Sequence, residues 1–341
     1  MFMKVVCFGE IMGRLSPVGY KRFVQADCFE VVYGGGEANV AVSLANFGQA
    51  AAFVTRLPQN DIGEAALRTL RAHGVDVSGV ARGGDRLGLY YCEKGASQRP
   101  SKVIYDRKNS AIATATQADF DWKTLFSGAD WFHFTGITPA LSEGCAALCL
   151  SACRTAKEMG LTVSCDLNFR KNLWSREKAG EVMGALMPMV DLVIANEEDC
   201  EKVFGIRAAD TDITGGKLSP EGYVSVAKAL VKKFGVKAVA ITLRTSLSAS
   251  DNRWAGMLFH NGKAVFSREY ALHIVDRVGG GDSFGAGLIY ALRNGYEDER
   301  AINFAVAASA LKHSIEGDMN EVSVAEVETL CAGDGSGRVQ R

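Results

Sequence analysis

The sequence lacks a large excess of either charge, because 38 lysines and arginines stand against 39 aspartates and glutamates among 341 residues. A chain so nearly neutral has no broad positive field that would gather nucleic acid or an anionic lipid surface. It also lacks an uncharged apolar run long enough to cross a bilayer, and the apolar run at the N-terminus ends at Phe8, too short for a secretion signal. We therefore expect no nucleic-acid partner, no membrane partner and a cytoplasmic location.

Paired cysteine spacing is also missing. The nine cysteines are scattered and odd in number, which in a large core-forming chain favours reduced thiols over a disulfide framework. Cys145, Cys149 and Cys153 recur every four residues, so a helix would place them on one face, where three thiols could bind a metal. Neighbours such as Ala146 and Leu148 favour instead a buried helix in which cysteine serves as a small apolar residue.

Two common phosphate-binding motifs are absent as well. The Gly-Lys pairs that begin at Gly216 and Gly262 are followed by Leu and Ala, whereas a P-loop has Ser or Thr after its lysine. No G-x-G-x-x-G occurs, since Asn39 takes the last glycine position after Gly34 and Gly36. The sequence therefore excludes a P-loop nucleotidase and a Rossmann dinucleotide site.

What the chain does contain is a regular alternation of short β-type runs and helical patterns. The first unit is a strand over Lys4–Phe8 and a helix over Asn39–Phe47, which ends at Gly48. Further strands are predicted at Ala51–Thr55, Trp131–Phe134, Thr162–Cys165, Leu192–Ile194 and Ala238–Leu243, with helices between them. Such alternation predicts an α/β fold with a parallel sheet covered on both faces.

Two stretches interrupt this alternation and mix glycine, serine and arginine with β-forming residues. They are 12–33 and 81–107, and we expect their strands to form a small accessory sheet inserted into the main domain. The main domain then comprises 1–11, 34–80 and 108–330. The remaining 331–341 is polar and glycine-rich, which is typical of a loose tail.

The most informative motif runs from Asp276 to Gly287 and reads DRVGGGDSFGAG directly before a helical pattern. Three successive glycines at the start of a helix let main-chain N–H groups converge where the helix dipole is positive, which suits a phosphate anion. Asp282 follows them. Its carboxylate is either the N-cap of the helix or a general base that takes the proton of an attacking hydroxyl.

A second glycine cluster, YGGGEANVA, begins at Tyr33. Alone it is equally typical of a tight turn before a helix. Together the two clusters resemble the signatures of the ribokinase/PfkB family of kinases, whose C-terminal signature reads Asp-Thr-x-Gly-Ala-Gly-Asp. Arg277 stands where that signature has Thr, and Gly280 stands where it has Ala. We expect the extra glycine to make the loop more flexible.

The resemblance implies a ribokinase-like three-layer α/β fold with a parallel sheet and a β-sheet lid. It implies ATP and Mg²⁺ as cofactors, a small sugar or sugar acid as substrate, and transfer of the γ-phosphate to a primary hydroxyl. It makes Asp282 the general base, and it implies an anion hole at Gly279, Gly280 and Gly281 and sugar contacts at Gly34, Gly35 and Asn39.

Two segments between the signatures extend the resemblance. One is Asp166-Leu167-Asn168-Phe169-Arg170, which looks like the Asp-x-Asn-x-Arg segment of 2-keto-3-deoxygluconate kinases and some fructokinases. This likeness implies that Arg170 lies near both the substrate and the transferring phosphate. The alternative is a solvated strand end. Asn196 to Asp199 resembles the Asn-x-x-Glu motif that organises Mg²⁺ near the nucleotide, with aspartate in place of glutamate, and a charged helix start is the alternative.

The nucleotide side departs further from the family pattern. Residues 241–250 read ITLRTSLSAS where the family usually has Lys-x-Gly-x-x-Gly, so we expect Thr242 and Arg244 to take part in nucleotide binding. Asn303 lies in a helical pattern, Ala301–Lys312, that the family packs beside the adenine. A plain core helix explains that pattern equally well.

Tyr90, Tyr105 and Arg107 lie in the second insert, where 2-keto-3-deoxygluconate kinases carry similar residues. An arginine fork binds a carboxylate with two hydrogen bonds, so Arg107 and Arg170 favour a sugar acid over a neutral sugar. The prediction is a 2-keto-3-deoxygluconate kinase. The alternatives are a fructokinase or another sugar kinase of the family, a nucleoside kinase, and a sugar-binding protein without catalysis. We also expect a homodimer formed through the lid, whose sheet edges favour pairing.

Overall fold

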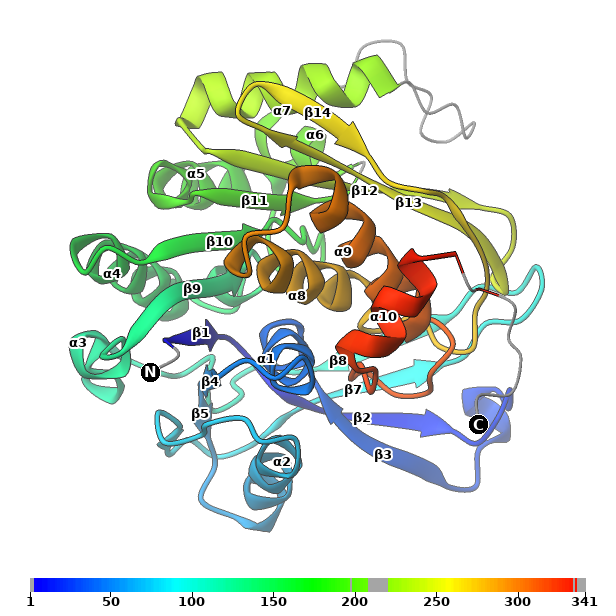
Figure 1. Ribbon diagram of the computed structural model, residues 1–341. Helices are drawn as coiled ribbons and strands as arrows, with labels where there is room; N and C mark the ends of the chain where they lie inside the picture. Colours follow the sequence, from blue (N-terminus) through cyan, green and yellow to red (C-terminus); the bar gives the residue numbers. More distant parts are fainter. Residues whose placement is uncertain (1–2, 197, 208–219, 334, 336–341) are drawn as a thin grey trace.

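The computed structural model describes residues 3–196, 198–207, 220–333 and 335. Its largest element is a nine-stranded sheet in which neighbouring strands follow the order β14-β13-β12-β11-β10-β9-β1-β4, with β15 paired to β13 (Figure 1). The strands are β1 (Lys4–Phe8), β4 (Ala51–Val54), β9 (Ala129–Thr135), β10 (Thr162–Asp166), β11 (Leu192–Ala195), β12 (Ala238–Ser246), β13 (Asp251–His260), β14 (Lys263–Phe266) and β15 (Tyr270–His273).

Helices cover both faces of this sheet. One face carries α1 (Gly36–Asn46), α2 (Asp61–Ala72), α8 (Gly280–Arg293), α9 (Asp298–Lys312) and α10 (Val324–Cys331). The other carries α3 (Trp122–Leu125), α4 (Glu143–Glu158), α5 (Arg176–Leu186), α6 (Asp199–Phe204) and α7 (Pro220–Phe234). Figure 1 shows α8 and α9 lying in front of the sheet. The three-layer α/β fold predicted from the alternating pattern is thus confirmed.

Strand alternation explains why there are two cores. Along β1, Val5 and Cys7 pack into the core on the α8 face, whereas Val6 and Phe8 pack into the core on the α4 face. Successive side chains of a strand point to opposite faces, so a strand that is apolar at every position serves two layers of helices. Cys145, Cys149 and Cys153 are buried in the α4-face core as small apolar residues, and all nine cysteines are free thiols.

The sheet differs from the prediction at one edge. Its strands from β4 to β12 are parallel, but β13 pairs with β12 in antiparallel register, and β14 and β15 pair with β13 in the same sense. The sheet is therefore mixed rather than wholly parallel. Residues 241–246 belong to β12, and the chain turns at 247–250 into the antiparallel β13.

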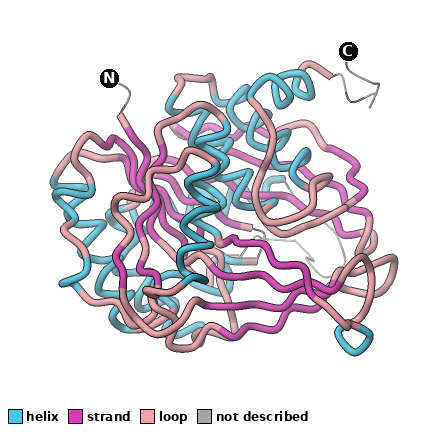
Figure 2. The backbone as a smooth tube through the Cα atoms, turned by 90° about the horizontal axis from the view of Figure 1, so that it is seen from below, coloured by secondary structure: helices cyan, strands magenta, loops and turns pink. Residues whose placement is uncertain are grey.

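A separate four-stranded sheet projects from the main body, and we call it the lid. Its strands are ordered β3-β2-β7-β8 and comprise β2 (Met12–Pro17), β3 (Phe29–Gly34), β7 (Gly88–Glu93) and β8 (Lys102–Asp106). Figure 2 shows these strands as a layer of their own beside the main sheet. Both predicted inserts contribute strands, but Ala81–Arg82 (β6), at the start of the second, pairs with β5 (Arg56–Leu57) instead.

Two further expectations concern the ends and the surroundings of the chain. The tail predicted at 331–341 lies largely outside the described residues, and Cys331 closes α10. Among the described residues, every helix is too short or too polar to reach across a bilayer.

Candidate active site

The main cavity opens at the carboxyl ends of the central parallel strands, under the lid. It encloses about 430 Å³, a size typical of small-ligand sites. Open α/β sheets bind ligands at this edge, because the loops that follow the strands converge there. Most of the residues singled out from the sequence line it: Gly35, Asn39, Tyr90, Tyr105, Arg107, Arg170, Asn196, Thr242, Arg244, Gly279, Gly281 and Asp282.

Asp282 lies in the first turn of α8, and its Oδ2 accepts a hydrogen bond of 2.7 Å from the Nδ2 of Asn39. The two glycine-rich clusters, 243 positions apart in the chain, therefore meet through these two side chains. Burial raises the pKa of Asp282 to about 6, although the hydrogen bond from Asn39 and the charge of Arg170 lower it. A carboxylate with this pKa is ionised at neutral pH and still basic enough to accept a proton.

The glycines before Asp282 have different roles. Gly279 has a φ of +82°, and a Cβ atom there would lie 1.9 Å from the carbonyl oxygen of Asp318, so no other residue fits. A Cβ at Gly281 would meet nothing, which leaves the backbone open to the cavity. A Cβ at Gly280 would lie 2.4 Å from Cε1 of His313. This glycine makes room for the imidazole, and its backbone is held where the Ser309 hydroxyl donates to its carbonyl at 2.7 Å; our expectation of greater flexibility was wrong.

Charged side chains gather where β10 ends. Burial raises the pKa of Asp166 well above its usual range, and the charges of Asp199 and Asp282 raise it further, while Arg170 lowers it. The guanidinium of Arg170 is exposed to the cavity and forms no hydrogen bond or ion pair within the described part of the chain. The carboxylates of Asp166, Asp199 and Asp282 offset the charge of Arg170, and its unbonded N–H groups remain available to a ligand in the cavity.

The lid side of the cavity is lined by Glu10, Tyr90, Tyr105 and Arg107. Arg107 is buried, and its Nε and NH2 groups both donate to Oε2 of Glu10, with the Nε distance 2.8 Å. The Ser110 hydroxyl donates to the other oxygen of Glu10 at 2.5 Å. Arg107 is therefore already paired inside the protein, contrary to the expectation of a guanidinium held open for the substrate, and only its NH1 group remains for a ligand.

A buried ionic network joins the lid to the glycine loop. Arg14, on β2, forms ion pairs of 2.8 Å with Asp276 and 2.9 Å with Asp318, and all three side chains are at most 3% exposed. Tyr90, on β7, donates its hydroxyl to the second oxygen of Asp318. Burial lowers the pKa of Lys312, whose ammonium lies near the same carboxylates and donates to the carbonyl of Ile315 at 3.0 Å. These contacts thus join the lid to the segments that flank the glycine loop, 279–281.

The hairpin side of the cavity is built by the β12–β13 hairpin and the start of the glycine loop. It is lined by Thr242, Arg244, Trp254 and Arg277. The Trp254 indole ring packs 5.1 Å from the His313 ring, and its Nε1 is buried with no partner within the described ranges. This side therefore carries two guanidinium groups, a hydroxyl and an unpaired N–H donor.

Four predicted residues do not line the cavity. A Cβ at Gly34 would strike the Asp318 side chain, and Gly280 faces His313. Asp199 is buried and accepts from the backbone N–H groups of Phe169 at 3.2 Å and Asn196 at 3.4 Å. Asn303 bonds the backbone N–H of Arg268 and the carbonyl of Glu299, away from the cavity. The position of Asn303 follows from the mixed edge of the sheet, which fills the space beside α9.

Several cavity residues escaped the sequence analysis. Glu10 lies two residues after the first strand, and Asp166 ends a later one, so the rule that ligand groups collect at strand ends could have found Glu10. Asp318 and His313 lie in the segment after α9, where no motif marks them. Only the contacts of Arg14 and Tyr90 with Asp318 reveal why a carboxylate is needed there.

Residues 3–324 match the family model described as pfkB family carbohydrate kinase. The chain is 32% identical over 338 residues to a 2-dehydro-3-deoxygalactonokinase of Haloferax volcanii, with 99% of each chain covered. It is 30% identical over 330 residues to a 2-dehydro-3-deoxygluconokinase of Bacillus subtilis, covering 96% of this chain and 94% of that one.

A solved structure resembles the fold closely. The crystal structure of 2-dehydro-3-deoxygluconokinase from Thermotoga maritima superposes with a TM-score of 0.94 at 51% identity, covering 98% of this chain and 99% of that one. The similarity therefore includes the lid and the main sheet alike.

Proposed function

This chain belongs to the pfkB family of carbohydrate kinases, and from that premise we propose that it transfers the γ-phosphoryl group of ATP to the primary hydroxyl of 2-keto-3-deoxygluconate. One observation carries the proposal. A carboxylate of raised pKa, Asp282, lies beside an open main-chain loop at the start of a 14-residue helix, in a cavity lined on one side by the lid.

In this mechanism Asp282 accepts the proton of the attacking sugar hydroxyl, and Asn39 holds the carboxylate in place through its 2.7 Å hydrogen bond. The N–H groups at the start of α8 and the positive end of the helix dipole stabilise charge on the transferred phosphoryl group. Arg170 adds a positive charge from the loop that follows β10. Phosphoryl transfer needs positioning and charge stabilisation above all, and these residues supply both.

ATP and Mg²⁺ are part of the proposal. The described residues hold no group of three or more His, Cys, Asp or Glu side chains arranged around a metal, so Mg²⁺ would be held mainly by nucleotide phosphates and water. Asp166 and Asn196 offer oxygen atoms at the cavity wall, and Mg²⁺ prefers such ligands. Asp199 fits a supporting role, because it orders the Asn196 loop through its backbone hydrogen bond. Bound Mg²⁺ neutralises the phosphates during transfer.

The substrate assignment depends on the arginines and on the relatives. Arg170 has free donors for a carboxylate, and Arg107 offers its NH1 group beside Tyr105. The galactonate epimer is a second candidate, because a relative at 32% identity carries that name. A neutral ketohexose such as fructose, or a nucleoside, would leave these positive groups without a partner.

The test is a coupled phosphorylation assay with 2-keto-3-deoxygluconate, its galactose-derived epimer, fructose, ribose and adenosine as acceptors. We expect kcat/KM for the gluconate acid to exceed that for fructose by at least about a hundredfold, since the neutral sugar offers the donors of Arg170 no carboxylate. Equal turnover of fructose would contradict the acid assignment. Sugar binding without any ATP consumption would contradict the kinase assignment and favour a binding protein without catalysis.

We propose further that the protein acts in the cytoplasm, which suits its nine free thiols, and that it forms a homodimer through the lid. Both edge strands of the lid expose apolar side chains, such as Val31 at 54% and Ile104 at 46%. Exposed apolar edges of this kind are usually covered. Light scattering on the purified protein tests the dimer, and Val31→Glu should convert it to a monomer; a monomeric wild type would refute it.

A further inference from the structure

Two departures from the family sequence pattern meet in space. One is Arg277, which stands where the signature has Thr, and the other is 241–250, which lacks the usual glycine-rich turn. In the structure the Arg277 NH2 group donates to the carbonyl of Ala249, at the tip of the β12–β13 hairpin, with a distance of 2.7 Å. The Arg277 side chain therefore supports the backbone of the hairpin segment that lacks the glycine-rich turn.

Arg277 and Arg244 form a positively charged wall on the hairpin side. Both line the cavity, and Arg277 is half-buried two positions before Gly279. Burial lowers the pKa of Arg277, and the charge of Arg244 lowers it further, while Asp276 raises it. The repulsion from Arg244 favours an anion beside Arg277, which itself forms no ion pair among the described residues.

The carboxylate next to these two arginines, Asp276, already has hydrogen-bonding partners within the protein. Asp276 accepts from Arg14 at 2.8 Å, from the backbone N–H of Gly317 at 3.2 Å and from that of Val278 at 3.1 Å. The other titratable neighbour is His313, whose pKa burial lowers to about 4, so it is neutral at pH 7. The internal groups near Arg277 therefore leave positive charge facing the cavity.

We propose that Arg277, together with Arg244, binds the polyphosphate chain of the nucleotide in place of the glycine amides that a glycine-rich turn would supply. This assignment rests on the proposed kinase function and adds a residue to it. A guanidinium offers up to five donors in a planar fork and matches phosphate oxygens with two parallel hydrogen bonds. With NH2 bound to Ala249, Arg277 keeps its NH1 and Nε edges for non-bridging phosphate oxygens.

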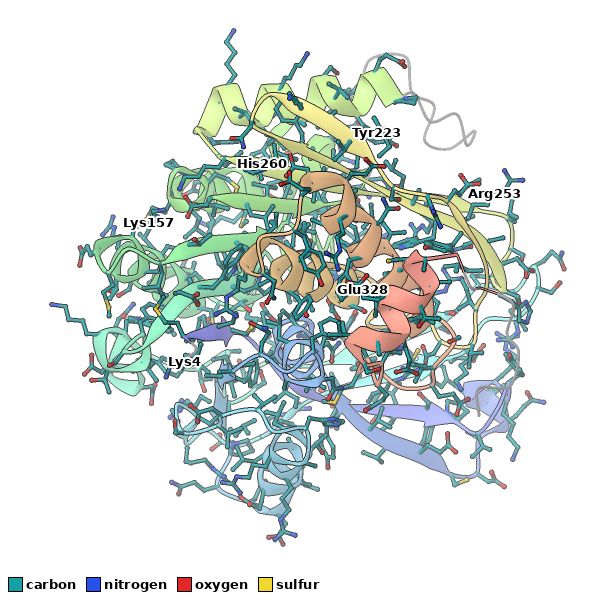
Figure 3. The ribbon with its side chains drawn as sticks, in the orientation of Figure 1. Lys4, Lys157, Tyr223, Arg253, His260 and Glu328 are labelled. Atoms are coloured by element: carbon teal, nitrogen blue, oxygen red, sulfur yellow. The ribbon has the colours of Figure 1, made fainter. Side chains whose placement is uncertain are left out.

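The test compares Arg277→Gln and Arg277→Lys with a matched control, Arg253→Gln. Arg253 lies on the same hairpin but points outward (Figure 3) and forms a loose ion pair of 3.6 Å with Glu269. Titration calorimetry measures binding of MgATP, MgADP and adenosine to each variant, and circular dichroism confirms that each one is folded. Steady-state assays give KM for ATP and for the sugar separately.

We expect Arg277→Gln to weaken MgATP binding by about tenfold to a hundredfold, the loss of one charge-assisted contact, and MgADP binding by less. Adenosine affinity and the sugar KM should stay within about twofold, and Arg277→Lys should fall between. The affinity for MgATP should also depend less steeply on salt than in wild type, because one charge is gone. Arg253→Gln should match wild type throughout.

Two results would overturn the assignment. MgATP binding by folded Arg277→Gln within about twofold of wild type would show that the guanidinium does not contact the phosphates. An equal loss of MgATP and adenosine affinity would show that Arg277 only supports the hairpin backbone. Failure of the wild type to bind MgATP at all would overturn the kinase proposal with it, so the two failures are distinguishable.

Discussion

The lid side and the hairpin side of the cavity differ in how the arginines Arg107, Arg14 and Arg277 are paired within the protein. On the lid side, Arg107 is paired with Glu10, and Arg14 is paired with Asp276 and Asp318 inside the protein. On the hairpin side, Arg277 donates to the carbonyl of Ala249 and forms no ion pair among the described residues, and the charge of Arg244 acts on it. Internal ion pairs therefore hold the side chains of the lid side in place, and few of their hydrogen-bond donors remain for a ligand. The hairpin side instead gathers positive charge that matches a highly anionic ligand.

The largest expected effect is at Asp282, between the two sides. Asp282→Asn keeps the shape and the contact with Asn39 but removes the proton acceptor, so we expect kcat to fall by about a hundredfold to ten-thousandfold. MgATP binding should change little. Asp298→Asn is the matched control, because Asp298 also lies in the first turn of a helix and pairs with His260 at the surface. An Asp282→Asn variant with full turnover would remove the general base from the mechanism.

The second effect tests whether the lid side is held by its buried ion pairs. Arg14→Met leaves Asp276 and Asp318 without their main partner in a buried site, which costs about 3 to 5 kcal/mol of unfolding free energy. On the hairpin side, Arg277→Met should cost about 1 kcal/mol, the value of one hydrogen bond. Urea unfolding of both variants measures the contrast. Equal losses would mean that the two sides do not differ in internal pairing.

The third effect separates the two sides by pH. The pKa of Asp282 is raised to about 6, and the carboxylate is the active form, so kcat/KM should fall about tenfold per pH unit below that pKa and level off above it. Guanidinium groups stay protonated over this range. The affinity for a nucleotide whose charge does not change with pH should therefore stay constant where kcat/KM falls. A flat rate profile between pH 5 and 8 would exclude Asp282 as the titrating base.

The smallest effect concerns Tyr90. Tyr90→Phe removes the hydrogen bond to one oxygen of Asp318, while Arg14 keeps the other. We expect a loss of about 1 kcal/mol in unfolding free energy and a smaller change in the KM for ATP than in the KM for the sugar. Tyr91→Phe, on the neighbouring lid position, is the control. A larger change in the KM for ATP than in the KM for the sugar would mean that Tyr90 also affects nucleotide binding.

The sequence predicted the glycine loop at the cavity far better than the side chains around it. Gly279 to Asp282 and Asn39 were found because glycines at a helix start and a carboxylate beside them form a local pattern. Asp318, His313 and Glu10 were missed or left aside, because their roles come from side chains distant in the chain, such as Arg14 and Arg107. Asn303 lies away from the cavity, and its contact with the backbone of Arg268 leaves no trace in its own helix pattern.

The amino-acid sequence by itself determined the α/β layering, the lid strands and the identity of the loop that ends in Asp282, because periodicity and local backbone demands are written in neighbouring residues. Tertiary structure alone decided which arginines are paired and which face the cavity. Arg14, Arg107, Arg170 and Arg277 are chemically alike in the sequence. Their surroundings give the first two internal carboxylate partners and direct the other two toward the cavity, and charge pairing depends on distances that no local pattern specifies.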